Sequence, residues 1–208
     1  LDHTIAAGAD HSIEIVELLK AAIDAKNESL RRDAKNEPLS LAEMKGEEIV
    51  LACKSGDLDS VKRLVEGGTS ANQSDAEGWT PLMYASKYGY LEINSYLLEN
   101  GADPNEVEPK RKASPLMMAA ENGHAFVVGL LLEKGAEVNA MSVDGKTALH
   151  YACDNGHFET VRILLSHGAN PEVVASSTES RLSAATMRGA TIIKLVQDAI
   201  KAREEKKK

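Results

Sequence analysis

The chain repeats itself at intervals of 33 or 34 residues, and this period restricts its possible folds more than any other feature. The segment Trp79–Ala85 (WTPLMYA) returns as Ala113–Ala119 (ASPLMMA) and again as Lys146–Ala152 (KTALHYA). Such a period is typical of chains that stack copies of one supersecondary unit, in which each copy buries its apolar side against its neighbours. The pattern therefore predicts a repeat fold.

Two positions occupied by small residues place five units in one register. The first position holds an alanine and the second, four residues later, holds a glycine. Three units also close with a Gly-Ala pair. The alanines are Ala52, Ala85, Ala119, Ala152 and Ala185, the glycines are Gly56, Gly89, Gly123, Gly156 and Gly189, and the closing pairs begin at Gly101, Gly135 and Gly168.

Each unit carries the signals of two helices joined by a tight turn. Thr80, Ser114 and Thr147 stand where a helix N-cap is needed, and Pro81 and Pro115 stand at the first helical position, where a missing N–H costs nothing. The glycine four residues after the small alanine should end the first helix, because glycine tolerates the left-handed conformation of a tight connection. An apolar second helix follows and should end at the closing glycine.

These motifs resemble the ankyrin-repeat family over residues 46–172. The family's Thr-Pro-Leu-His-x-Ala-Ala-x-x-Gly-His pattern and its Gly-Ala-Asp-x-Asn closing are matched in pieces by residues 80–105, 114–139 and 147–170. The resemblance implies an all-α fold: an ankyrin-repeat solenoid of stacked helix-turn-helix units with β-turn loops.

We expect three parts along the chain. Residues 1–45 are a degenerate N-terminal ankyrin-like repeat, or alternatively a helical cap of another kind, with a polar insertion. Residues 46–178 hold four ankyrin repeats. Residues 179–208 form a C-terminal capping repeat, which keeps Leu182, Ala185 and Gly189 in register, and a charged tail.

Charge and hydropathy exclude several classes of function. Twenty-four basic and 32 acidic residues give a formal net charge of -8, which argues against nucleic acid and anionic membranes as partners. No apolar run approaches the roughly 20 residues that a membrane-spanning helix needs. We expect a cytoplasmic, or also nuclear, protein that is a monomer on its own. Because the chain starts with Leu1 rather than Met, we also expect it to be a piece of a longer protein.

No local constellation of residues predicts catalysis, so we expect no enzyme activity, no cofactor and no metal site. His124 and His157 occupy equivalent positions of adjacent units, one repeat apart, and therefore cannot share a metal ion. The resemblance implies that each braces the neighbouring turn. Cys53 and Cys153 are separated by intervening repeats and cannot form a disulfide, so we expect buried, reduced thiols.

The resemblance implies a protein or peptide partner bound on the concave surface made by the loop tips and the first helices. The chain would then act as an adaptor or scaffold; the alternative is a regulatory or targeting domain excised from a larger enzyme or channel. The expected contact positions vary from unit to unit. They are Glu77, Trp79, Tyr84, Lys87, Tyr88, Arg111, Ala113, Glu121, Asn122, Val143, Asp144, Lys146, Asp154 and Asn155.

Trp79 is the strongest of these candidates, because it is the only tryptophan and because Trp and Tyr dominate interface hot spots. The alternative is that its indole packs on the neighbouring loop and supports the stack. The run Lys110-Arg111-Lys112 also has two interpretations: a contact for an acidic partner or a nuclear-import signal, against a solvated loop tip.

Overall fold

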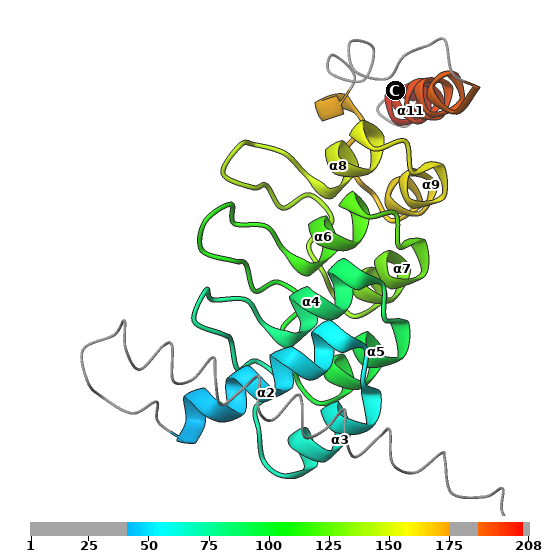
Figure 1. The fold of residues 1–208 in the computed structure, drawn as a ribbon. Helices are drawn as coiled ribbons and strands as arrows, with labels where there is room; N and C mark the ends of the chain where they lie inside the picture. Colours follow the sequence, from blue (N-terminus) through cyan, green and yellow to red (C-terminus); the bar gives the residue numbers. More distant parts are fainter. Residues whose placement is uncertain (1–40, 175–186, 206–208) are drawn as a thin grey trace, which may run out of the picture. The chain divides into compact units, whose positions relative to one another are not determined.

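The computed structural model describes residues 41–174 and 187–205, and in these residues it contains helices and no strand. Four helix pairs follow one another along the chain, and after them come helical residues 172–174 and a long final helix (Figure 1). The first helices of the pairs are α2 (Leu41–Ser55), α4 (Pro81–Tyr88), α6 (Pro115–Glu121) and α8 (Ala148–Asp154). The second helices are α3 (Leu58–Glu66), α5 (Leu91–Glu99), α7 (Ala125–Glu133) and α9 (Phe158–Ser166), and the final helix is α11 (Met187–Glu205).

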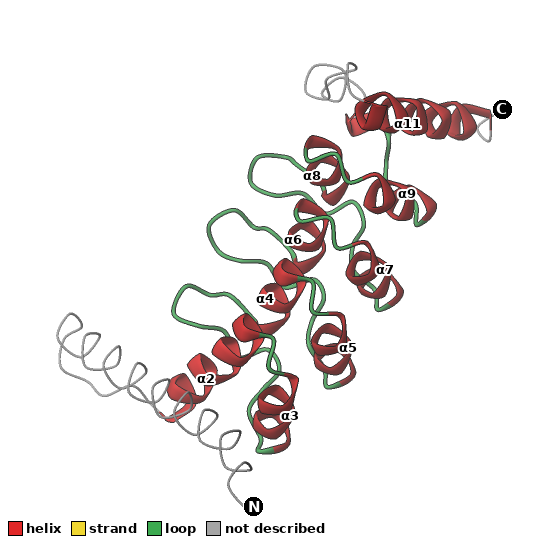
Figure 2. Ribbon diagram, turned by 45° about the vertical axis from the view of Figure 1, so that its right-hand side comes forward, coloured by secondary structure: helices red, strands yellow, loops and turns green. Residues whose placement is uncertain are grey.

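The pairs stack in two layers. Helices α4, α6 and α8 pack side by side in one layer, and α3, α5, α7 and α9 pack side by side in the other. Figure 2 shows the long loops between the pairs projecting on the side of the first helices. This arrangement confirms the predicted all-α stack of helix-turn-helix units.

The predicted start signals work as expected in the second and third pairs. The hydroxyl of Thr80 accepts a hydrogen bond from the N–H of Met83 at 3.4 Å, and that of Ser114 accepts one from Met117 at 3.3 Å. Pro81 begins α4, as Pro115 begins α6. Each cap satisfies an N–H that has no partner within its helix.

The turn between the two helices of a pair explains the glycine and the histidine that recur in each unit. Gly89 ends α4 with φ of 79°, and a Cβ on this residue would lie 2.4 Å from the ring of His124. The His124 ring reaches across from the next unit and lies 3.0 Å from the carbonyl oxygen of Lys87. His157 repeats this contact with the carbonyl of Glu121, also at 3.0 Å. The bracing role expected of both histidines is confirmed.

A row of asparagine side chains joins each unit to the next. Asn72 donates to the carbonyl of Gly101 at 2.8 Å and accepts from the N–H of Asp103 at 2.8 Å. Asn105 makes the same two bonds one unit later, to Gly135 at 3.1 Å and from Glu137 at 2.8 Å, and Asn139 repeats them. We call these three residues the asparagine row.

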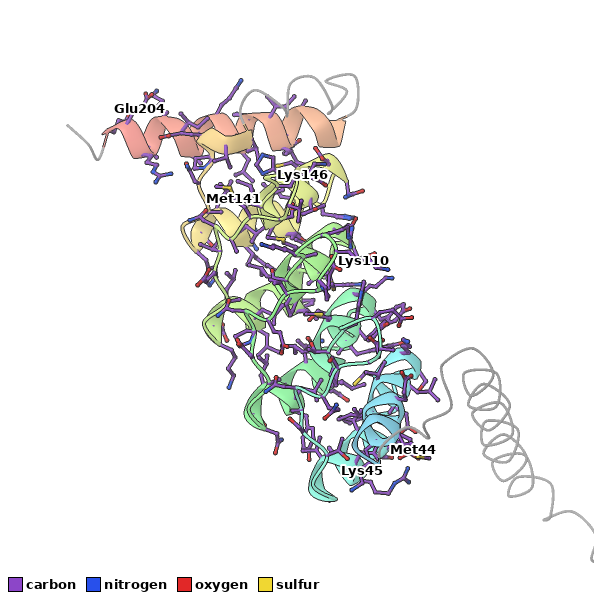
Figure 3. All side chains as sticks on the ribbon, turned by 90° about the vertical axis from the view of Figure 1, so that its left-hand side faces the viewer. Met44, Lys45, Lys110, Met141, Lys146 and Glu204 are labelled. Atoms are coloured by element: carbon purple, nitrogen blue, oxygen red, sulfur yellow. The ribbon has the colours of Figure 1, made fainter. Side chains whose placement is uncertain are left out.

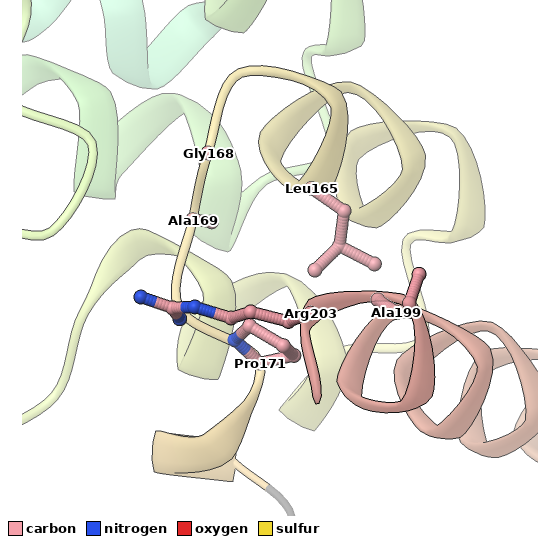
Figure 4. Close-up of a pocket in the computed structure, with 7 residues that line it drawn as sticks. Leu165, Gly168, Ala169, Pro171, Ala199 and Arg203 are labelled. Carbon is pink, nitrogen blue, oxygen red and sulfur yellow. The ribbon is translucent and has the colours of Figure 1, made fainter. Parts of the chain in front are cut away.

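The last unit departs from the predicted pattern. Gly189 lies inside α11, so the prediction that it ends a helix is wrong. Helix α11 is instead one continuous helix whose buried Ile192 and Val196 belong to the core, and it packs on α9. Its Arg203 side chain donates to the Asn170 side chain. A pocket of about 370 Å³ lies between this helix and the end of α9 (Figure 4).

The ends of the stack leave part of the domain prediction open. Helix α2 begins at Leu41 and runs across the predicted boundary at residues 45 and 46. The degenerate repeat or cap expected over residues 1–40, and Leu182 with Ala185, lie outside the described residues. Within the residues that are described, no helix is long and apolar enough to cross a membrane.

Candidate functional site

Each long loop is closed by an acceptor side chain that turns back onto its own main chain. In the loop before α4, the Asp75 carboxylate accepts from the N–H groups of Glu77 and Trp79, at 3.1 and 2.9 Å. The hydroxyl of Tyr84 donates to its second oxygen at 2.8 Å. Burial and then the bond to Asp75 raise the pKa of Tyr84, so this phenol stays protonated and keeps donating.

The loop before α6 uses a longer acceptor and a longer tip. Buried Glu108 accepts from the N–H groups of Lys110 and Arg111, and the residues between Glu108 and Ala113 include one more than the equivalent stretch between Asp75 and Trp79. The tip therefore extends outward and presents three exposed cations, Lys110, Arg111 and Lys112. Figure 3 views the molecule from the side of these loops, with Lys110 and Lys146 labelled.

The loops also contact one another. The N–H of Val143 donates to the carbonyl of Arg111 at 2.8 Å, which joins the loop before α8 to the loop before α6. Pro109 lies against Gly78 so closely that a Cβ on the glycine would be 2.6 Å from its ring. These contacts hold the loop tips in a fixed order along one side of the stack.

An aromatic cluster with a bound ammonium lies at the second unit. The ring centroids of Trp79 and Tyr84 are 5.0 Å apart, and the Lys87 ammonium lies 5.2 Å from the Trp79 ring and 5.7 Å from the Tyr88 ring. Trp79 is half-buried, whereas 44% of Tyr88 is exposed. Trp79 therefore packs on Tyr84 and Lys87 of its own unit and leaves part of its surface accessible, and its role as a partner contact stays a prediction.

A hollow of about 360 Å³ opens beside this cluster, and residues of three consecutive units line it. Six of its lining residues were predicted contact positions, and the seventh, Met118, is 1% exposed. The lining residues are Trp79, Lys87, Arg111, Met118, Glu121, Asn122 and Asn155. We call this pocket the central hollow.

Two of the predicted contact residues are corrected by their burial. Tyr84 is 8% exposed because its hydroxyl reaches inward to Asp75, and Ala113 is 2% exposed because it lies at the base of its loop. Neither presents a side chain to a partner. The neighbouring Met83 and Met117 are buried as well.

The other predicted residues lie outside the central hollow and are accessible to different degrees. Glu77, Val143 and Asp144 are exposed on the loop tips. Lys146 and Asp154 form an ion pair at 2.7 Å and are less exposed.

Sequence reasoning missed Lys54, whose ammonium lies 4.2 Å from the Tyr84 ring and 3.8 Å from the Asp75 carboxylate. It stands 33 residues before Lys87, so the repeat frame itself was the signal that could have found it.

The two cysteines are placed as expected. Cys53 and Cys153 are free and buried, and burial raises the pKa of each thiol to about 12. A thiol with such a pKa is not a nucleophile near neutral pH. Among the described residues, no group of three or more His, Cys, Asp or Glu side chains is arranged to hold a metal ion.

Comparison with known proteins places the chain in a class. The sequence model of the family described as "Ankyrin repeats (3 copies)" matches residues 3–108 and 104–175. Because these matches cover most of the chain, it belongs to the ankyrin-repeat family. Members of this family are generally protein-interaction modules and typically not enzymes.

Individual relatives match parts of the chain. Protein phosphatase 1 regulatory subunit 27 of Homo sapiens is 48% identical over 52 residues, which are 25% of this chain and 34% of the relative. "Ankyrin repeat, SAM and basic leucine zipper domain-containing protein 1" of Neofelis nebulosa is 37% identical over 71 residues, 34% of this chain and 15% of the relative. DNA-binding protein RFXANK of Homo sapiens is 40% identical over 60 residues, 28% of this chain and 23% of the relative. The matched part is thus at most about a third of each relative's length.

Proposed function

We propose that this chain is an adaptor or scaffold that binds a partner protein through the surface formed by its loop tips and first helices. The observation that carries the proposal is the central hollow, where side chains from three consecutive units meet. A contact surface that crosses units suits an elongated partner segment, because each unit then contributes a few side chains to one binding site.

The chemistry of this surface favours a protein partner. Trp, Tyr and Arg are the residues most enriched at interface hot spots, and Trp79, Tyr88 and Arg111 lie at or beside the central hollow. Trp79 and Lys87 stack on one another, so little side-chain freedom remains to be lost on binding.

Site-specific photo-crosslinking in cells of the source organism tests the proposal. A photoreactive phenylalanine analogue replaces Tyr88, which is 44% exposed beside the hollow, or Phe126, which is 81% exposed on second helix α7 and serves as the matched control. We expect a discrete crosslinked protein from position 88 and none of that mass from position 126. Crosslinks from position 126 alone would place the partner on the other layer and contradict the proposal.

A regulatory domain of a larger enzyme or channel is the second candidate, and one relative favours it. Protein phosphatase 1 regulatory subunit 27 is by name the regulatory subunit of an enzyme. Mass spectrometry of the material crosslinked at position 88 distinguishes the candidates. An enzyme or channel subunit as the captured protein supports regulation, and a non-catalytic partner supports an adaptor.

We propose a protein rather than nucleic acid as the partner, although DNA-binding protein RFXANK is by name DNA-binding. The net charge of -8 opposes attraction to phosphates, and binding to duplex DNA at low salt would contradict this choice.

We also propose a cytoplasmic or nuclear location for a monomer, because reducing compartments keep cysteines such as Cys53 and Cys153 as free thiols.

A further inference from the structure

The ammonium of Lys87 is held in place without a counter-ion. It lies 5.2 Å from the Trp79 ring and 5.7 Å from the Tyr88 ring. No carboxylate oxygen of the described residues lies within 4.0 Å of its Nζ. Aromatic faces orient a cation but leave its charge uncompensated, so this group can still bind an anion.

Arg111 is similarly available, although two carboxylates lie near it. Its guanidinium is 3.7 Å from Glu108 and 3.7 Å from Glu121. Both distances exceed the roughly 2.7–2.9 Å of a charge-assisted hydrogen bond. Glu108 is buried and its oxygens already accept from main-chain N–H groups, so it does not saturate the guanidinium.

Charge changes sign along the stack at the central hollow. The equivalent position of the four first helices holds Lys54, Lys87, Glu121 and Asp154 in order. Asp154 pairs with Lys146 at 2.7 Å, so its charge is compensated within its own unit. Cations therefore outnumber carboxylates at the hollow, on a chain whose net charge is -8.

We propose that the central hollow binds an extended acidic segment of the partner protein. A carboxylate of the segment faces Lys87 and Arg111, and a neighbouring apolar side chain lies against the indole of Trp79. The inference rests on the proposed function, since it names the chemistry of the partner for the same surface. Charge complementarity selects the segment, and the stacked rings keep Lys87 in a binding conformation before it arrives.

Selection from a phage-displayed library of random linear peptides tests the chemistry directly. The selected peptides are synthesised, and their affinities are measured by fluorescence anisotropy for the native chain and for a Lys87→Gln, Arg111→Gln double variant. The matched control is Lys134→Gln, Lys194→Gln, which removes the same charge from exposed positions on α7's end and on α11. Circular dichroism and urea unfolding verify that all three proteins are folded.

We expect enrichment of Asp or Glu next to an aliphatic or aromatic residue. The affinity should fall about tenfold in the Lys87 and Arg111 variant and less than about twofold in the control, and added salt should weaken binding to the native chain.

The outcomes separate this inference from the proposed function. Acidic peptides that bind the double variant as tightly as the native chain would overturn the inference. So would peptides that lose affinity in a Tyr88→Ala variant but contain no excess of acidic residues, and in that case the proposed surface would stand. Failure to select any peptide sensitive to Tyr88→Ala would count against the surface and the inference together.

Discussion

Lys112 takes a left-handed backbone conformation that, at the equivalent positions of the flanking loops, is taken by glycine. Its φ is 50°, and it is the only non-glycine residue with positive φ in the described part of the chain. The equivalent positions of the flanking loops are Gly78 and Gly145, with φ of 79° and 69°. A residue with a Cβ is strained in this conformation. The third cation at the tip of the loop before α6 therefore comes with local backbone strain.

Replacing Lys112 with glycine should therefore stabilise the chain. We expect the free energy of unfolding to rise by about 0.5–1 kcal/mol, since relief of the left-handed strain outweighs the added flexibility of glycine. Urea unfolding of Lys112→Gly measures the effect. Lys110→Gly is the control, because Lys110 is equally exposed but has no positive φ, and it should give no gain. Equal gains in both variants would rule out backbone strain as the cause.

Individual residues show which structural roles could be predicted from the repeat spacing. The frame correctly assigned Thr80, Pro81 and Gly89 their roles, because caps and tight turns depend on residues nearby in sequence. The prediction that Tyr84 contacts a partner was wrong, because equivalent positions were compared by spacing alone and the side chain is buried. The inward hydrogen bond to Asp75 depends on how the loop folds back over the helix, which spacing does not describe.

Helix α3 illustrates how an element starts without the Thr-Pro signal. Asp57 is its N-cap and accepts from the N–H of Ser60 at 3.0 Å. Hydrogen bonds from Ser60 lower the pKa of the Asp57 carboxyl below its ordinary value. The carboxylate of the folded chain thus remains charged at a pH where that of the unfolded chain binds a proton. Its contribution to the free energy of unfolding is therefore present above the ordinary pKa, and it is lost as the pH falls through the lowered pKa of the folded chain.

An Asp57→Ala variant should lose about 0.5–1 kcal/mol of stability at pH 7, the usual effect of an exposed cap. The difference from the native chain should shrink toward zero as the pH falls below the lowered pKa, because the protonated carboxyl caps poorly. Asp57→Asn is the control and should stay close to the native chain at pH 7, since an amide also caps. Urea unfolding across this pH range measures both, and a constant difference at every pH would contradict the assignment.

The final element marks the limit of pattern reasoning. Spacing placed Gly189 at a helix end, yet it lies inside α11. Leu182, Ala185 and Gly189 continue the register, but this unit lacks the Thr-Pro start and the Gly-Ala closing. Without those signals nothing local ends a helix at Gly189, and packing of Ile192 and Val196 in the core favours the helix that continues past it.

At the scale of the whole molecule, stability depends on contacts between adjacent units. The helices from α3 to α9 pack on the equivalent helices of the adjacent units, and α11 packs on α9 at the end of the row. In such an array the stability of a unit depends on its own helices and on the interfaces with the units beside it. A destabilising substitution in α11 should therefore lower the stability of the unit that contains α8 and α9 more than that of the other units.

Ile192→Ala tests this expectation. Removing a fully buried side chain should cost about 2–4 kcal/mol, and hydrogen exchange should accelerate in α11, α9 and α8 more than in α4 and α5. Gln197→Ala, exposed on the same helix, is the control and should leave exchange unchanged. Uniform acceleration over all helices would indicate that the stack unfolds as one cooperative body instead.

The asparagine row has a consequence for how such a chain can change over evolutionary time. Asn72, Asn105 and Asn139 bond main-chain atoms of the following unit and no side chain of it. The residues that donate to them, Asp103, Glu137 and Asn170, accordingly differ in side chain. At these joints a unit can therefore be duplicated, deleted or exchanged between genes without a matching change in the side chain of the next unit, so the exposed loop residues can diversify while the asparagine bonds stay the same.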